Sequence, residues 1–167
     1  MTFIGIISDY KSFEKIEEQL KDKKIDINLI HINKKSIQNM KNIKFETIIV
    51  DCSLKNFVPE KRIIKQIISN AKYIIINQDL NEKEEWNRGQ KLITYGINQK
   101  SDVTVSSITE TGILIYLQKN ITNRKNKTYE IGEQLIKIKE KNKLKVYEIL
   151  IIFIIFLLYD SHIIDET

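Results

Sequence analysis

The stretch FIGIISDYKSFEKIEEQLKDK, residues 3–23, is the part of the sequence that best indicates the fold. Its Ile-rich beginning, Phe3 to Ser8, is typical of a strand that is buried on both faces. From Ser12 to Lys23, three apolar residues recur at helical spacing: Phe13, Ile16 and Leu20. Serine is also a residue type that caps helices. The stretch therefore predicts a strand, a turn and a helix whose cap is Ser12.

The same alternation of apolar strands and helical segments continues to residue 96. Pro59 opens a predicted helix over residues 60–71, and residues 82–86 predict a further short helix. The other predicted strands cover residues 25–32, 45–51, 72–77 and 91–96. Near-continuous apolar strands separated by helices indicate a parallel sheet that is covered on both faces. We therefore predict an α/β fold with a mostly parallel, Rossmann-like sheet flanked by helices.

After Gly96 the pattern changes to that of neighbouring antiparallel strands. Residues 102–108 and 112–118 predict two strands joined by a turn, and residues 123–126 predict a second turn before a strand over 128–140. The last helix, residues 145–159, is apolar nearly all round and must therefore be enclosed. We predict one domain over residues 1–167. Its three parts are the parallel α/β part at 1–100, antiparallel strands at 101–143, and the C-terminal helix and tail at 144–167.

The composition excludes several classes of protein. The chain has 167 residues and a net charge of +5, but its basic residues are dispersed rather than gathered with exposed aromatic residues, so we predict no nucleic-acid partner. The single cysteine, Cys52, excludes an internal disulfide and a cysteine-based metal cluster. His31 and His162 are isolated, and they do not indicate a zinc site.

The uninterrupted apolar run Ile149 to Tyr159 raises the question of a membrane segment. A spanning helix needs about 20 apolar residues, and shorter runs are more often buried core helices. We therefore predict a buried helix and no membrane span, with peripheral attachment through this helix, or a homodimer built partly on it, as alternatives. The N-terminus has no basic region before its apolar run and no cleavage site, which predicts a cytoplasmic protein.

One motif suggests a nucleotide. GIISDYKS, residues 5–12, has the spacing of the phosphate-binding loop G-x-x-x-x-G-K-[ST], except that Tyr10 stands where the second glycine belongs. The glycines of such a loop allow several backbone N–H groups to converge on the phosphates. Tyr10 opposes this geometry, and Asp9 adds a negative charge. Lys11 and Ser12 are the candidate nucleotide-binding residues, in a segment that we interpret as a strand, a turn and a helix N-terminus without phosphate function.

Polar residues also follow two of the predicted strands. Asp51 comes at the end of one strand, and Asn77 and Asp79 come at the end of the next. The carboxyl ends of parallel strands share one edge of the sheet, where open α/β folds bind ligands. Asp51 is the candidate Mg²⁺ ligand because this cation prefers carboxylates, and Asn77 and Asp79 are further candidate nucleotide-binding residues.

The order of motifs over residues 71–108, AKYIIINQDLNEKEEWNRGQKLITYGINQKSDVTVSSI, resembles the end of the central, ATP-binding domain of the Mur ligases. In that family a strand ends in N-x-D-D, and the motifs "TYG" and "ADVTASSI" follow it. Residues 77–80 of this chain match the first motif except that Leu80 replaces the second aspartate, and residues 94–96 and 101–108 resemble the other two. Residues 143–166 resemble a family helix without its His and Asn. The resemblance covers roughly residues 65–166.

This resemblance implies a role for several residues. Lys11 and Ser12 correspond to the family's phosphate- and magnesium-contacting Lys and Thr, and Asp51 stands at the position of a magnesium-binding Glu, with Ser53 retained. The loop glycines, the later His and carbamylated Lys, and the flanking ligase domains have no counterpart. We therefore expect a non-catalytic binding or regulatory module linked to cell-wall precursor metabolism. It would have no cofactor, and its partner would be a second copy or a cell-wall synthesis protein. The alternative is a small nucleotide-binding protein or enzyme that uses ATP and Mg²⁺ at the carboxyl edge of the sheet.

Overall fold

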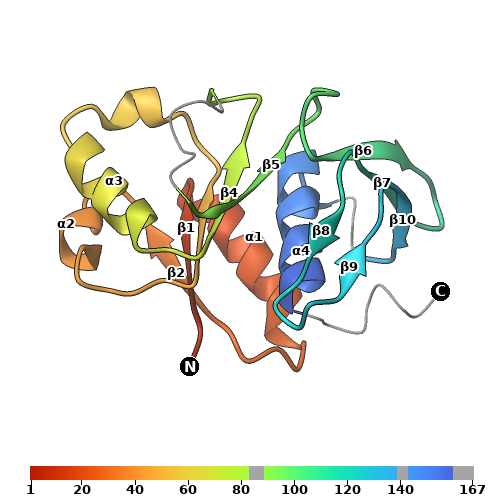
Figure 1. Ribbon diagram of the computed structural model, residues 1–167, viewed down its shortest axis with the longest axis horizontal. Coiled ribbons are helices and arrows are strands. Elements are labelled where there is room, and N and C mark those ends of the chain that lie inside the picture. The colour runs from red at the N-terminus through yellow and green to blue at the C-terminus, as the bar shows by residue number, and fades with distance from the viewer. Residues whose placement is uncertain (83–88, 139–142, 160–167) are drawn as a thin grey trace. The chain divides into compact units, whose positions relative to one another are not determined.

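The computed structural model describes residues 1–82, 89–138 and 143–159. The predicted fold class is confirmed: the chain is an α/β protein with a mostly parallel eight-stranded sheet, a separate two-stranded antiparallel sheet and a C-terminal helix (Figure 1). The chain divides into two compact units. The first unit comprises residues 1–14 and 26–94, and the second comprises residues 15–25 and the chain from residue 95. The expectation of one domain stays a prediction.

The first unit contains the parallel part of the fold. Its strands lie in the order β2-β1-β3-β4-β5. Their bounds are β1 Phe3–Ile7, β2 Asn28–Ile32, β3 Thr47–Val50, β4 Tyr73–Asn77 and β5 Lys91–Tyr95, of which the last residue belongs to the second unit. The pairs β1–β2, β1–β3 and β3–β4 are parallel. Because β1 lies between β2 and β3, the strand order reverses direction at β1 and β3, which is the switch point where such sheets bind ligands.

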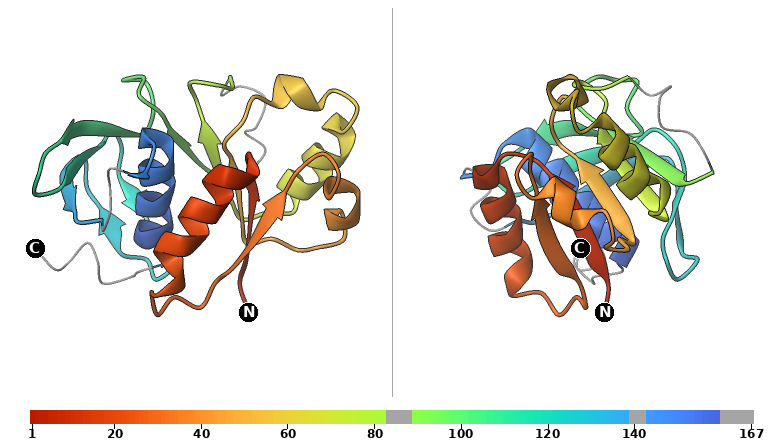
Figure 2. Two further views of the ribbon diagram at one scale, coloured as in Figure 1. Left: turned by 180° about the vertical axis from the view of Figure 1, so that it is seen from behind. Right: turned by 90° about the vertical axis from the view of Figure 1, so that its left-hand side faces the viewer.

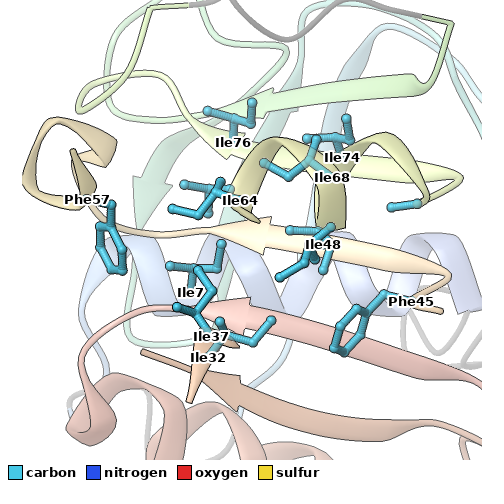
Figure 3. Close-up of a cluster of buried hydrophobic side chains, with 13 residues drawn as sticks. Ile7, Ile32, Ile37, Phe45, Ile48, Phe57, Ile64, Ile68, Ile74 and Ile76 are labelled. Carbon is cyan, nitrogen blue, oxygen red and sulfur yellow. The ribbon is translucent and has the colours of Figure 1, made fainter. Parts of the chain in front are cut away.

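One face of these strands carries the main apolar cluster of the first unit. Two short helices, α2 (Ile37–Met40) and the 3₁₀ helix η1 (Leu54–Phe57), and the longer α3 (Lys61–Ser69) provide its other side. Figure 2 shows α2 and α3 along the same side of the strands. Figure 3 shows strand residues meeting helix residues, among them Ile48, Ile64 and Phe57. Every second side chain along β1, β3 and β4 points into this cluster, as the apolar runs in the sequence predict.

Gly5 lies within β1, and its lack of a side chain allows this cluster to close. A Cβ at this position would come within 2.7 Å of side-chain atoms of both Ile32 and Ile48, and within 3.1 Å of the Phe45 ring. The first glycine of the motif at residues 5–12 is therefore a packing residue inside a buried strand and not a loop residue.

The second unit contains the antiparallel addition. Strand β6 (Val103–Ile108) pairs antiparallel with β7 (Ile113–Leu117), and β7 pairs antiparallel with β10 (Gly132–Ile136). At Tyr95 the end of β5 pairs in parallel with Val103. The short strands β8 (Ile121–Thr122) and β9 (Thr128–Tyr129) form a hairpin whose turn contains Asn126 in the left-handed region, at φ 64°. The predicted antiparallel region is therefore confirmed, with the hairpin in addition.

The C-terminal helix α4 (Val146–Tyr159) is buried along most of its length, as predicted. Its residues with 2% exposure or less include Ile152, Phe153, Phe156 and Leu157. Within the described parts of the chain, no helix combines the length and the apolar character needed to cross a membrane.

A buried carboxylate organises the start of α4. The Glu148 carboxylate, only 1% exposed, accepts a hydrogen bond from the backbone N–H of Lys145 at 2.8 Å. This is the reciprocal half of a capping box, in which an acidic residue of the first turn bonds back to the cap. Lys15 places its ammonium 3.7 Å from the same carboxylate and donates to the carbonyl of Lys143 at 2.7 Å.

Several predicted boundaries differ from the structure. The cap assignment of Ser12 is wrong: helix α1 (Tyr10–Lys21) begins two residues earlier, because the Asp9 carboxylate accepts the backbone N–H of Ser12 at 2.9 Å. Helix α3 begins at Lys61, so Pro59 lies in the preceding turn rather than in the helix. The strand predicted over residues 128–140 is divided into β9 and β10 at residues 130–131, and β10 begins at Gly132, whose φ is 139°. The short helix predicted at residues 82–86 falls almost entirely outside the described residues.

Candidate functional site

Three of the predicted site residues come together where β3 and β4 end. Asn77, the last residue of β4, donates a hydrogen bond from Nδ2 to Oδ1 of Asp51 at 3.1 Å. Its Oδ1 accepts the backbone N–H of Asp79 at 3.1 Å. Asn77 is completely buried, whereas Asp79 is exposed and Asp51 is partly buried. We call Asp51, Asn77 and Asp79 the edge cluster.

The edge cluster lies next to the switch point of the parallel sheet. The backbone N–H of Asp51 donates to the carbonyl of Ile7 at 2.8 Å, which joins the carboxyl ends of β3 and β1. The nitrogen and the oxygen of the Asn77 side-chain amide both make hydrogen bonds within the cluster, so Asn77 positions Asp51 and the turn after β4. The acidic groups that a ligand can reach from solvent in this cluster are therefore those of Asp51 and Asp79.

Asn81 holds the loops after β3 and β4 together. Its Nδ2 donates to the carbonyls of Cys52 at 2.8 Å and Asn77 at 3.2 Å. Its Oδ1 accepts the backbone N–H of Leu54 at 3.0 Å. The sequence analysis missed this residue. Asparagine side chains often bond to nearby backbone, but partners 27 and 29 residues away are not visible in a local pattern.

Cys52 lies beside the edge cluster, but its thiol is unreactive. Burial, and secondarily the negative charge of Asp51, raise the pKa of its thiol to about 12. The thiolate is the nucleophile and the metal ligand, so a thiol with this pKa supplies neither function at neutral pH.

The corner between β1 and α1 holds Lys11 and Ser12. Two residues, Ser8 and Asp9, separate the end of β1 from the start of α1. The Asp9 side chain accepts the N–H of Ser12, and its carbonyl accepts the N–H of Phe13 at 3.2 Å. Ser12 is buried in the first turn of α1, and Lys11 is exposed. A helix N-terminus attracts anions through such N–H groups, and here a carboxylate of the chain itself occupies that position.

An aromatic group that the sequence analysis did not anticipate adjoins this corner. The ring of His31 lies 5.4 Å from that of Tyr10 and 5.1 Å from that of Phe13, between centroids. Its Nε2 is 2.8 Å from the carbonyl of Ser8, which can only accept, so Nε2 carries the proton. Tyr10 is 59% exposed in the first turn of α1. Helical spacing of residues 10 and 13 is visible in the sequence, but their meeting with His31 depends on the pairing of β1 with β2.

The described residues place limits on a metal site. Within residues 1–82, 89–138 and 143–159, no three His, Cys, Asp or Glu side chains are grouped so that they could hold a metal ion. Asp51, the predicted magnesium ligand, has Asn77 as its neighbour, and an amide nitrogen that donates to a carboxylate is not a cation ligand.

Comparison with known proteins adds no identification. No model of a protein family matches the chain, and no curated protein matches it significantly.

Proposed function

We propose that the chain is a non-catalytic relative of the Mur ligase central domain that acts as a binding or regulatory module linked to cell-wall precursor metabolism. The resemblance rests on the sequence motifs over residues 71–108 and their order. The observation that carries the non-catalytic part is the hydrogen bond from the Ser12 N–H to the Asp9 carboxylate at 2.9 Å.

This hydrogen bond opposes phosphate binding in two ways. The carboxylate already accepts an N–H group that a phosphate oxygen would use at the start of α1. It also carries a negative charge at that position. Two like unit charges 4 Å apart repel by about 4 kcal/mol at the effective dielectric constant near a protein surface. The exposed Lys11 offsets part of this repulsion only at the cost of its own hydration.

The position of Gly5 supports the same proposal. A phosphate loop needs flexible residues between strand and helix, and here Gly5 lies within β1, where an added Cβ would come within 2.7 Å of Ile32 and Ile48. Two residues remain to connect β1 to α1, so the backbone has no loop that could wrap around a phosphate.

The test is a calorimetric titration of the full chain with ATP and Mg²⁺, together with an ATPase assay. We expect no binding heat at millimolar ATP and no hydrolysis. Magnesium-dependent ATPase activity that Lys11→Ala abolishes would overturn the non-catalytic proposal. The link to the cell wall is tested separately, by deleting the gene and measuring the pool of muramyl peptide precursors, and an unchanged pool counts against it.

The alternative, a small nucleotide-binding protein or enzyme working at the sheet edge, is favoured by one observation. The edge cluster places two carboxylates beside the switch point between β1 and β3. The same titration distinguishes the two functions. Nucleotide binding that Asp79→Ala weakens and Lys11→Ala leaves unchanged would favour the alternative, because Lys11 lies at the α1 corner and Asp79 in the turn after β4.

A further inference from the structure

A separate hollow lies on the first unit, between the η1–α3 segment and the turn after β4. Its volume is about 200 Å³. Eight residues line it: Leu54, Lys55, Val58, Lys61, Ile64, Leu80, Asn81 and Glu82. All of them belong to the first unit.

The wall of the hollow is predominantly apolar. Leu54, Ile64, Val58 and Leu80 contribute aliphatic side chains. Val58 is 71% exposed and Leu80 is 40% exposed, although both are large apolar residues. Exposed aliphatic side chains gathered around a hollow favour an apolar ligand, because its binding removes their surface from water.

Asn81, the uncharged polar residue of the lining, already makes hydrogen bonds within the protein. Asn81 donates to two carbonyls, of Cys52 and Asn77, and accepts the N–H of Leu54. This network keeps the wall in place, since it ties the turn after β4 to the start of η1. Recognition of a polar group on a ligand is therefore left to the three charged residues of the lining.

Those charged residues favour an anion. Lys55 and Lys61 bring two positive charges and Glu82 brings one negative charge. Among the described residues, no ion pair involves Lys55 or Lys61. The charged residues of the lining therefore sum to +1, which attracts an anion and repels a cation.

We propose that this hollow binds a small carboxylate with an apolar body, of the size of a single aromatic ring or a short branched chain. The body would lie against Leu54, Ile64 and Leu80, and the carboxylate would lie at Lys55 and Lys61 at the rim. A cavity of about 150 Å³ accepts benzene, so this hollow has room for one ring with its carboxylate. The site goes beyond the proposed function, because it uses neither the α1 corner nor the edge cluster.

The test is a titration of the full chain with benzoate, followed through backbone amide signals by NMR. Benzyl alcohol and benzylamine serve as neutral and cationic probes of the same shape. We expect benzoate to shift the amide signals of residues 54–64 and 80–82, with an affinity at least threefold above that of benzyl alcohol and weaker at high salt. Benzylamine should bind more weakly than either.

Matched variants locate the two parts of the site. Lys61→Gln should weaken benzoate binding at least threefold, whereas Lys65→Gln, which changes an exposed lysine of the same helix outside the lining, should leave it unchanged. Leu80→Asp should abolish binding, and its amide spectrum checks that the fold is retained. Equal binding of the three probes, shifts confined to other residues, or equal effects of the two lysine variants would overturn the proposal. None of these results depends on the ATP titration.

Discussion

At the scale of single residues, Asp9 decides where α1 begins. Both Asp9 and Ser12 are good cap residues, and the spacing of Phe13, Ile16 and Leu20 fits a start at either one. The structure selects Asp9, whose carboxylate accepts the N–H three residues later. The sequence could not separate the two because the decision depends on which side chain reaches a backbone donor.

Asp9→Ala should therefore lower the free energy of unfolding by about 1 kcal/mol, the usual value of a lost cap. Lys11→Ala is the control, since this exposed residue should contribute no more than about 0.5 kcal/mol. Urea denaturation of both variants measures the difference. Equal stabilities would show that Asp9 does not cap α1.

Cys52 provides a prediction that depends on pH. Its folded-state pKa of about 12 exceeds the ordinary thiol value of 9.0, so the folded chain holds the thiol proton more tightly than the unfolded chain. The associated stability is present below pH 9 and is lost as pH rises toward 12. The native protein should react slowly with a thiol reagent at pH 8 and rapidly in urea.

The control is Cys52→Ser, which has no thiol to titrate. The two chains have the same titrating groups except for this thiol. Between pH 9 and 12 the wild-type chain should therefore lose more stability than the variant. Parallel stability curves, or rapid modification of the native thiol, would contradict the raised pKa.

At the scale of elements, the strands were the most predictable part of the fold. Apolar runs ending in a polar residue placed β1, β3, β4 and β5 within two residues of their observed ends. The short α2 and η1 were missed, because a segment of one turn is too short to show a helical period. Asp51, Asn77 and Asp79 could be grouped in advance, since strand ends in a parallel sheet share an edge.

The start of α4 depends on Glu148. Glu148→Ala removes the acceptor of the Lys145 N–H and the partner of the Lys15 ammonium, so it should cost about 1–3 kcal/mol. Glu148→Gln keeps an acceptor oxygen and loses only the charge, and it should cost less. Thermal or urea unfolding of the two variants measures the contributions separately. Equal losses would show that the hydrogen bond to the cap contributes nothing.

At the scale of the whole molecule, the strand order was the least accessible to sequence reasoning. A run of apolar residues shows that a strand exists, but not which strands are its neighbours. The order β2-β1-β3-β4-β5 brings the ends of β1 and β3 together, and through the Asp51 N–H it sets the edge cluster beside them. The hydrogen bond between His31 Nε2 and the Ser8 carbonyl follows from the same order.

Helix α4 gives the prediction that bears on the stability of the whole chain. An apolar run as short as residues 149–159 is compatible with a core helix or a surface anchor, and the two differ in burial. Phe156 is 2% exposed, so its ring belongs to the core. Phe156→Ala should cost roughly 3–5 kcal/mol, from lost apolar burial and the cavity left behind.

The matched control is Lys137→Ala, an exposed position outside the core, which should change the stability by no more than about 0.5 kcal/mol. Equilibrium denaturation in urea measures both variants, and the midpoint should fall for Phe156→Ala alone while the slope is retained. A Phe156→Ala variant as stable as the wild type would contradict the core assignment. So would extraction of the wild-type protein from cells only with detergent, because a helix whose apolar side chains are enclosed has no surface to offer to lipid.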